Sequence, residues 1–297
     1  MTYQAFGARI ESPIPLSLPL ATDNPELRAT INIVLGSVEM PYDGDGCLHR
    51  VGNIQYFARG ERVAIFVPRA GEIEVLSDTL LHIQPLEGEP QGLLAAYITG
   101  FAFLFILKRR GFITFHGSAV SDGRNAFLIL GKKGGGKSTT AAALSLEGFT
   151  SYSDDLSLVS PKGEVYPGNP IARLLPDTHE TLFGAVESSG DDFDGIEKRE
   201  YQLSAEMSPR KLGCIFVLKL VDADRLMVAQ VRGAAKATAV FPHFSALPGL
   251  DTPAVLIALA EACIKNVPLY ILERPAAGDS LKEVVAAIKK VARNTER

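Results

Sequence analysis

A glycine- and lysine-rich segment, residues 131–140, carries a residue pattern that can hold a phosphate chain. Its spacing, Gly131-x-x-x-x-Gly136-Lys137-Ser138, is the complete P-loop, or Walker A, pattern. Glycines allow backbone N–H groups to point at phosphate oxygens, the lysine places a positive charge on the β- and γ-phosphates, and the serine offers a hydroxyl to Mg²⁺. The pattern follows an apolar, strand-like segment and precedes an alanine-rich, helix-like one, which is the context that it requires. We predict an ATP site whose contacts are Gly131, Gly134, Gly135, Gly136, Lys137, Ser138 and Thr139.

Two adjacent carboxylates, Asp154 and Asp155, follow at a distance that returns them to this loop. A helix of about 11 residues after the glycines descends roughly 16 Å, and the next six residues climb back roughly 20 Å as a strand. A right-handed crossover would place that strand beside the one before the loop. Neighbours in a strand point to opposite sides, so one carboxylate can hold Mg²⁺ and the other can accept a proton from an attacking hydroxyl. A capped turn or a solvated pair is the alternative.

A hairpin is expected just before the loop, in residues 112–131. Asp122-Gly123 between two apolar segments favours a type I′ turn of two residues. That register would place His116 opposite Ile129, at the mouth of the glycine-rich loop. His116 could steady the γ-phosphate or a carboxylate there, and a buried core histidine is the other interpretation.

Other charged residues are weaker candidates. The basic side chains that could also reach a phosphate are Arg173, Lys198 and Arg199. The acidic segment 188–197 does not match a calcium loop, and we expect a solvated, mobile loop carrying Asp191, Asp192 and Asp194.

Composition excludes several classes of protein. The 297 residues are 46% hydrophobic and 22% charged, with a formal net charge of −4, so no basic footprint for nucleic acid is evident. Three separated cysteines and scattered histidines give neither a disulfide framework nor zinc spacing. The N-terminus lacks a basic flank followed by an apolar run. These features favour a cytoplasmic protein.

Two regions are expected along the chain. Residues 1–90 alternate apolar and polar residues and predict a β-rich N-terminal domain, whereas residues 91–297 contain every motif described above and predict a catalytic domain. The apolar stretch 93–107 falls short of the roughly 20 residues of a membrane span. We therefore expect a fully buried core helix and no membrane partner.

The histidine hairpin, the glycine-rich loop and the paired aspartates together resemble the HPr kinase/phosphorylase-like P-loop kinases. The resemblance rests on "FHGSAV", "LILGKKGGGKSTTAAALSLEGF", "SYSDDLSLV" and "YPGNPIARLLPD". It implies an α/β fold with a P-loop kinase core of the HPr-kinase/PEP-carboxykinase-like type. It further implies catalytic roles for Asp154 as the base, for Lys137, and for His116 at the phosphate, with Ser138 and Asp155 serving Mg²⁺.

The resemblance also implies a reaction, the transfer of the ATP γ-phosphate to a serine of a peptide or protein. The branch with this length and layout modifies ribosomal peptide precursors, including lasso-peptide precursors. Thr139 replaces an acidic residue of the bifunctional enzymes, and no Glu-[Ile/Leu]-Arg-Gly segment is found, with Glu197 as the nearest acidic stand-in. Both departures argue against phosphorylase activity.

Three functional hypotheses follow from the sequence. The first is the Mg²⁺- and ATP-dependent serine kinase, the second a nucleotide-binding regulator with little turnover, and the third a kinase of a small-molecule hydroxyl. A GTPase of the common kind is disfavoured because no Asn-Lys-x-Asp segment is present. Exposed strand edges in the N-terminal region could also pair two copies into a homo-oligomer.

Overall fold

The chain divides into two compact units in the computed structural model. The structure describes residues 1–22, 27, 29–39, 47–51, 53–184, 189–193, 196–203, 206–247 and 251–294. Unit 1 comprises Met1–Thr114 and Ser245–Val255, and unit 2 comprises Phe115–Phe244 and Leu256–Arg297. This division groups residues 91–114 with the N-terminal strands, whereas the sequence suggested a boundary at residue 90.

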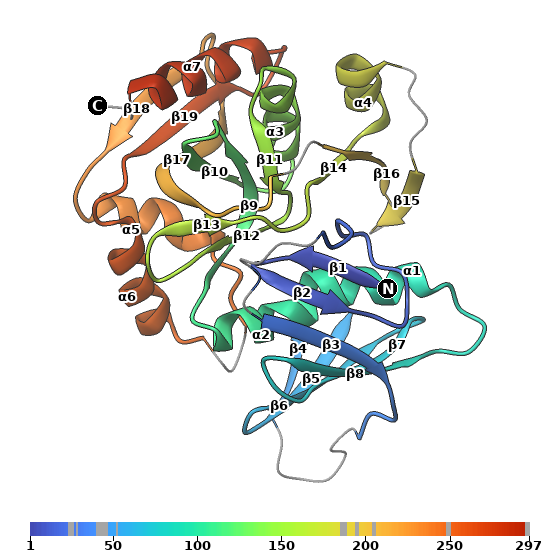
Figure 1. Cartoon of the computed structure of the whole chain (residues 1–297). Helices are drawn as coiled ribbons and strands as arrows, with labels where there is room; N and C mark the ends of the chain where they lie inside the picture. The colour runs from blue at the N-terminus through green and yellow to red at the C-terminus, as the bar shows by residue number, and fades with distance from the viewer. Residues whose placement is uncertain are drawn as a thin grey trace. The chain divides into compact units, whose positions relative to one another are not determined.

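Unit 1 is a mainly antiparallel sheet with one long helix (Figure 1). Its elements are β1 (Thr2–Ala5), β2 (Ala8–Glu11), β3 (Ala29–Leu35), β4 (Cys47–Val51), β5 (Ile54–Arg59), β6 (Arg62–Val67), β7 (Gly71–Val75), β8 (Leu80–Pro85), α1 (Gln91–Tyr97), the π-helical turn η1 (Ile98–Ala102) and α2 (Phe103–Arg109). The strand order is β1-β2-β3-β8-β7-β6-β5-β4, in which β3 lies parallel to both of its neighbours.

The helix 91–109 packs against this sheet through aromatic side chains. Phe103 meets Phe6 edge to face, with ring centroids 5.7 Å apart, and Phe105 meets Tyr56 at 5.3 Å. Among the residues that the structure describes, this helix alone is long and apolar enough to span a membrane by length and composition, and 61% of its most apolar window is buried within the protein. The helix is thus a core element of unit 1, but it is not buried all round, because Gln91, Gly92 and Gly100 are exposed and Ala96 and Tyr97 are half-buried.

Unit 2 contains the remaining elements, two of which cross the boundary between the units. They are β9 (Ile113–Ser121), β10 (Asn125–Gly131), α3 (Lys137–Leu146), β11 (Thr150–Ser153), β12 (Leu156–Val159), β13 (Glu164–Tyr166), β14 (Ile171–Leu174), α4 (Pro176–Phe183), β15 (Ser189–Phe193), β16 (Ile196–Gln202), β17 (Arg210–Val221), β18 (Met227–Val231), α5 (Ala235–Val240), the 3₁₀ turn η2 (Phe241–His243), α6 (Pro253–Ile264), β19 (Leu269–Pro275) and α7 (Leu281–Asn294).

The main sheet of unit 2 has the order β10-β9-β12-β13-β17-β19-β18. Because β10 also pairs with β17, strands β10, β9, β12, β13 and β17 form a closed circuit of pairings. Strands β10, β17 and β19 are mutually parallel, so their carboxyl ends share one edge. A smaller antiparallel sheet, β14-β16-β15, lies apart from this one (Figure 1).

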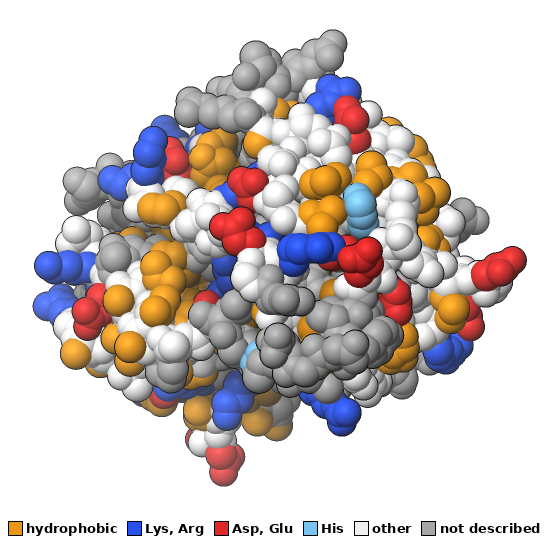
Figure 2. Space-filling view, turned by 90° about the horizontal axis from the view of Figure 1, so that it is seen from below, with side chains coloured by type: hydrophobic (Ala, Val, Ile, Leu, Met, Phe, Trp, Pro, Cys, Tyr) orange, Lys and Arg blue, Asp and Glu red, His pale blue; other side chains and the backbone are white. Residues whose placement is uncertain are grey.

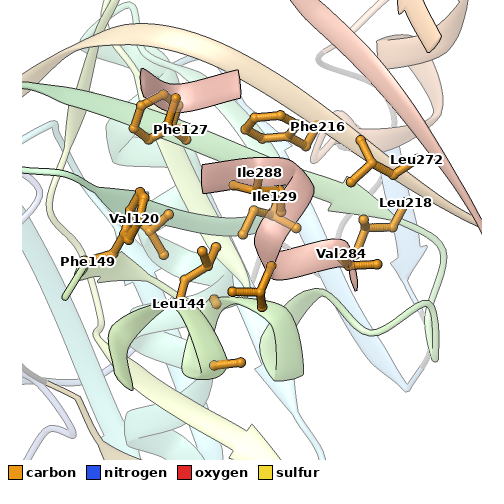
Figure 3. Packing of buried hydrophobic residues seen from close by; sticks show 14 of the residues in the cluster. Val120, Phe127, Ile129, Leu144, Phe149, Phe216, Leu218, Leu272, Val284 and Ile288 are labelled. Atoms are coloured by element: carbon orange, nitrogen blue, oxygen red, sulfur yellow. The ribbon is translucent and has the colours of Figure 1, made fainter. Parts of the chain in front are cut away.

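A hydrophobic cluster fixes the parallel strands against two helices (Figure 3). Its labelled members include Phe127 and Ile129 of β10, Phe216 and Leu218 of β17, Leu272 of β19, Leu144 of α3, and Val284 and Ile288 of α7. Full burial of one such side chain contributes about 1.5–3 kcal/mol. The cluster therefore holds the carboxyl edge of the sheet rigidly relative to the start of α3.

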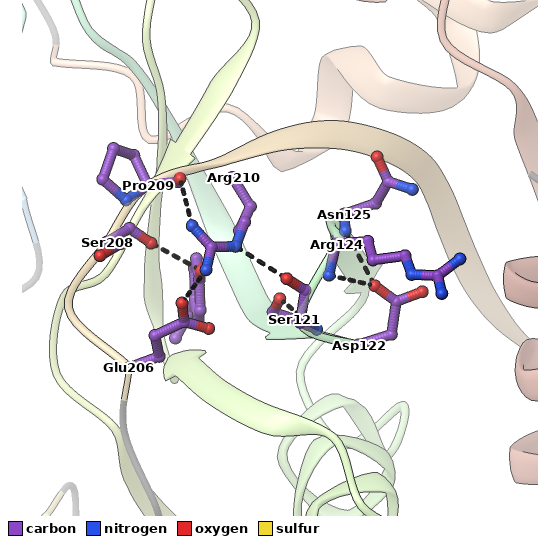
Figure 4. A network of polar contacts seen from close by, with 10 residues as sticks. Ser121, Asp122, Arg124, Asn125, Glu206, Ser208, Pro209 and Arg210 are labelled. Carbon is purple, nitrogen blue, oxygen red and sulfur yellow. Dashed lines mark hydrogen bonds and ion pairs between the residues drawn. The ribbon is translucent and has the colours of Figure 1, made fainter. Parts of the chain in front are cut away.

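The predicted hairpin is present, but its turn is centred on Gly123-Arg124 instead of Asp122-Gly123, since the Asp122 N–H donates to the Asn125 carbonyl at 3.2 Å. Ser121 pairs with Ala126 rather than with Arg124, so the register moves by two residues. The Asp122 carboxylate accepts hydrogen bonds from the N–H groups of Arg124 and Asn125, at 2.9 and 2.8 Å, which hold the turn in this position. Figure 4 shows this turn beside the Arg210 side chain, whose Nε donates to the Gly123 carbonyl at 3.0 Å.

The shifted register brings the histidine closer to the glycine-rich loop than expected. The last pair of β9 with β10 is Gly117 with Leu130, so His116 stands at the level of Gly131 instead of Ile129. A shift by two residues preserves the face of the strand on which a side chain lies. The histidine therefore keeps its predicted side.

Two other expectations are corrected. Strand β11 pairs with β9, not with β10, so β9 lies between the strand before the loop and the strand that returns to it. The acidic segment is not a loop, because Asp191 and Asp192 belong to β15 and pair with β16. Asp194 lies outside the described residues.

Charged side chains of both signs are interspersed on the face shown in Figure 2. On that face the lysines and arginines lie among aspartates and glutamates and do not gather in one patch. Such a surface gives no concentrated field for a polyanion on that side of the protein.

Candidate active site

The glycine-rich loop, residues 131–136, connects the end of β10 to the start of α3. Its Gly136 is the N-cap of α3 at φ +88°, a left-handed conformation that favours glycine. The Gly135 N–H donates to the Lys132 carbonyl at 3.0 Å, which tightens the loop. The α3 dipole therefore directs its positive end to the carboxyl edge of the sheet, where an anion is favoured.

Lys137 extends back across this loop. Its Nζ donates to the Gly131 carbonyl at 2.9 Å and to the Lys132 carbonyl at 3.2 Å, and only 8% of the residue is exposed. The ammonium is therefore held within the loop, at the place where the sequence pattern expects phosphates.

Asp154 lies near the start of α3. Its Oδ1 accepts a 2.6 Å hydrogen bond from the Ser118 hydroxyl, and its Oδ2 accepts the Arg173 N–H at 3.4 Å. The Ser138 hydroxyl is near enough to favour the ionised carboxylate. Burial raises the pKa of Asp154 above its ordinary value, and the neighbouring Asp155 charge adds to the rise, while these hydrogen bonds oppose it. The carboxylate thus has an increased proton affinity next to Ser138.

Asp155 has different surroundings, although it is the next residue. Its Oδ1 lies 3.1 Å from Nδ1 of His116, and both side chains are exposed, by 62% and 49% respectively. The backbone of Asp155 has φ +106°, a conformation that residues other than glycine rarely adopt. Hydrogen bonds in both directions between Asp155 and Gly117, each 3.2 Å, hold this conformation.

The structure therefore brings His116, Lys137, Ser138, Asp154 and Asp155 to one edge of the sheet. The Ser138 hydroxyl lies near enough to Asp154 to lower its pKa, whereas the sequence had grouped Ser138 with Asp155 as metal ligands. The residues Gly131, Gly134, Gly135 and Gly136 form the loop itself, and Thr139 is half-buried in the first turn of α3.

The additional basic candidates have different positions. The backbone N–H of Arg173 donates to Asp154, and its side-chain Nε donates to Glu200 at 2.7 Å. Arg199 is half-buried on β16, in register with Leu174 of β14. Lys198 pairs with Asp191 in the backbone register, and its side chain lies outside the described set. A phosphate role for Arg199 or Lys198 stays a prediction.

Three further residues near this edge were not predicted from the sequence. Ser118 lies on the same face of β9 as His116, so strand periodicity could have indicated it. His243 is buried on η2, where burial, with smaller effects from Lys137 and His116, lowers its pKa to about 4, so it is neutral at pH 7. Arg274 is the penultimate residue of β19 and lies beside Gly136. Neither of the last two has a local sequence signal.

The donor set suits a magnesium ion that is shared with a nucleotide. A hydroxyl and two carboxylates are hard oxygen donors, which Mg²⁺ prefers, usually with several waters and phosphate oxygens. Within the described ranges no group of three or more histidines, cysteines or carboxylates could hold a metal alone. The residues thus fit a phosphate-bound ion better than an independent metal site.

A cavity of about 450 Å³ opens at the same edge of the sheet. It lies between the β17–β18 loop and the β19–α7 loop, and its lining includes Asp224, Pro275, Asp279 and Ser280. Ser280 is 6% exposed, and its buried hydroxyl has no hydrogen-bond partner among the described residues. Cavities that hold small molecules have volumes of about 300–1,000 Å³.

Comparisons with known proteins do not establish a function for this chain. No family model matches the chain, and no curated protein matches its sequence. Among solved structures, the chain is similar to the Hpr(Ser) kinase/phosphatase from Coxiella burnetii, with 13% sequence identity and a TM-score of 0.29, over 62% of this chain and 95% of that chain. A similarity at this TM-score carries no argument about fold or function.

Proposed function

We propose that the protein is an ATP-dependent kinase that transfers the γ-phosphate to a serine hydroxyl of a peptide or protein. One observation carries the proposal. The carboxylate of Asp154, with its raised pKa, lies close enough to the Ser138 hydroxyl for that hydroxyl to favour its ionised form, and Ser138 follows Lys137 at the start of α3. The proposed proton acceptor is thus near the proposed phosphate-binding loop, which is the arrangement that phosphoryl transfer to a hydroxyl needs.

In the proposed reaction, Asp154 accepts the proton of the serine hydroxyl as the serine oxygen bonds to the γ-phosphorus. The bond between that phosphorus and the β–γ bridging oxygen breaks, and ADP leaves with the bonding electron pair. Asp154 then returns the proton to solvent. A base with increased proton affinity is suited to this step, because general-base catalysis improves as the base pKa approaches the working pH.

Positive groups around the loop would stabilise the charge that develops on the transferred group. Lys137 exchanges its bonds to the loop carbonyls for phosphate oxygens, and the N-terminus of α3 faces the same anion. Mg²⁺, when bound with the nucleotide, would neutralise phosphate charge, and Ser138 and Asp155 are its proposed ligands. Because Ser138 also lies near Asp154, the two carboxylates are tested separately.

The acceptor would approach from the exposed side of the pair His116–Asp155, since both side chains are open to solvent. The sequence resemblance suggests a ribosomal peptide precursor of the lasso type as this acceptor. The nucleoside half of ATP would occupy the cavity beside Pro275, where the carboxylates of Asp224 and Asp279 can accept hydrogen bonds from ribose hydroxyls or the adenine amine.

The test is to incubate the protein with γ-labelled ATP, Mg²⁺ and a panel of serine peptides that includes a lasso-type precursor. We expect label on a serine of one peptide and a loss of about 10²–10⁴-fold in rate for Asp154→Asn. Asp155→Asn, tested in parallel over a range of Mg²⁺ concentrations, should raise the concentration needed for half-maximal rate.

Other outcomes would favour one of the alternative functions or exchange the roles of the two carboxylates. Tight Mg·ATP binding without transfer to any acceptor would contradict the kinase and favour the nucleotide-binding regulator. Label on a small hydroxyl compound but on no peptide would retain the kinase and change its substrate class. A shifted Mg²⁺ requirement in Asp154→Asn, rather than in Asp155→Asn, would exchange the roles of the two carboxylates.

A further inference from the structure

Arg274 reaches the glycine-rich loop from a distant part of the chain. It is the penultimate residue of β19, which lies parallel to β17, which in turn lies parallel to β10. The pairings of Gly131 with Leu218 and of Leu218 with Leu272 place Arg274 two residues beyond the level at which β10 ends. Its position on the carboxyl edge is therefore fixed by the sheet rather than by a loop.

The guanidinium lies directly against the loop at Gly136. A β-carbon added to Gly136 would stand 2.5 Å from Nη1 of Arg274, closer than any real contact of that kind. The guanidinium thus occupies the space that a side chain would take at the N-cap of α3. Gly136 immediately precedes Lys137, so two cationic side chains converge on one end of this helix.

Arg274 has unused hydrogen-bonding capacity in this place. Its Nε is buried and has no hydrogen-bond partner among the described residues. No carboxylate in the described ranges forms an ion pair with it either. A buried donor without a partner is costly, more so on a charged group, and in native structures it calls for an explanation. An anion bound at the loop would supply the missing acceptor.

We propose that Arg274 is a catalytic residue that, together with Lys137, binds the terminal phosphate of ATP. This inference rests on the proposed kinase function. The planar guanidinium can donate two parallel hydrogen bonds to two oxygens of one phosphate, which a lysine cannot do. Arg274 therefore recognises the transferring phosphoryl group, whose charge is spread over three equatorial oxygens, rather than the nucleotide as a whole.

The test uses the full-length protein and compares Arg274→Gln and Arg274→Lys with Arg232→Gln as the matched control. Arg232 is exposed and follows β18 directly, and its Nη2 donates to Gln230 of that strand. Binding of Mg·ADP, and of Mg·ADP with aluminium fluoride as a mimic of the transferring phosphoryl group, is measured by titration calorimetry. This readout needs no phosphate acceptor.

We expect Arg274→Gln to bind Mg·ADP within about threefold of the wild type and to lose about 10²–10³-fold in affinity for the aluminium fluoride complex and in kcat. Arg274→Lys should recover only part of this loss. Arg232→Gln should lose neither affinity nor kcat. Equal affinity of Arg274→Gln and wild type for the aluminium fluoride complex would overturn the inference while leaving the kinase intact. A wild-type protein that binds neither complex would overturn the kinase proposal as well.

Thermal unfolding separates this role from a structural one. Removing a buried donor that lacks a partner should leave the midpoint of Arg274→Gln unchanged or raised. A lowered midpoint combined with unchanged aluminium fluoride binding would show that Arg274 supports the fold instead, and would contradict the proposal.

Discussion

The hydrogen bond between Ser118 and Asp154 should set the pH at which the protein becomes active. At 2.6 Å it is short, as expected for a hydroxyl that donates to a carboxylate. A hydrogen bond to a charged group contributes about 1.5–3 kcal/mol. Because it stabilises the ionised form, its loss in Ser118→Ala raises the proton affinity of Asp154, in the same direction as burial does already.

The size of the effect follows from the energy of that bond. One pH unit corresponds to 1.36 kcal/mol, so Ser118→Ala should move the acid limb of kcat/KM to higher pH by about 1–2 units. The acid limb of kcat/KM reports the ionisation of Asp154 in the free enzyme. The plateau of kcat/KM at high pH should be largely retained, since Asp154 is ionised there in both proteins. The assay is phosphate transfer to the identified peptide, measured from pH 5 to pH 9.

Ser157→Ala provides the matched control. Ser157 is also buried, and its hydroxyl donates to the Gly117 carbonyl at 2.9 Å without touching Asp154. An acid limb that stays in place in Ser118→Ala, or that moves equally in Ser157→Ala, would refute the reasoning that ties this serine to the ionisation of the base.

Three further predictions concern the same edge of the sheet. Lys137→Ala should lower kcat/KM by about 10²–10³-fold in the transfer assay, whereas the exposed control Lys162→Ala should not change it. Because the pKa of His243 is lowered from 6.5 to about 4, the free energy of unfolding should fall as pH drops below about 6.5, by about 2 kcal/mol at pH 5, and urea titrations of His243→Asn should lack this part of the loss. Asp155→Gly should relieve the strain at φ +106° and stabilise the fold by about 1 kcal/mol in denaturant titrations while impairing transfer.

Each of these predictions can fail separately. An unchanged kcat/KM in Lys137→Ala would contradict the phosphate assignment. Parallel pH dependence of stability in His243→Asn and wild type would exclude this histidine as the source. A destabilised Asp155→Gly would mean that the carboxylate contact with His116 outweighs the backbone strain.

Local features of the fold were predictable because they depend on neighbours in the sequence. The glycine spacing indicated the loop between β10 and α3, and the rise per residue in a helix and a strand returned Asp154 to the level of that loop. The predicted hairpin register was wrong for a local reason, since the Asp122 carboxylate accepts hydrogen bonds from two backbone N–H groups and the turn is centred one residue later. Turn dipeptides alone do not reveal such hydrogen bonds.

Features that depend on the order of strands were not predictable. Strand β9 pairs with both β10 and β11, and nothing in the sequence of β11 distinguishes that partner from β10. Arg274 and His243 reach the loop only because β19 and η2 are placed by long-range pairing and packing. A charged residue at the end of an apolar strand reads as a surface group until the neighbouring strand is known.

The backbone of Asp155 has a consequence beyond this one chain. Glycine would occupy that conformation at lower energy. If the carboxylate had no function, substitution of the aspartate by glycine would therefore cost the protein no stability. Retention of a carboxylate at such a position across diverging sequences would mean that selection acts on its chemistry despite the strain in the backbone. A strained aspartate of this type is therefore a marker that could separate functional proteins from inactive copies of the same fold.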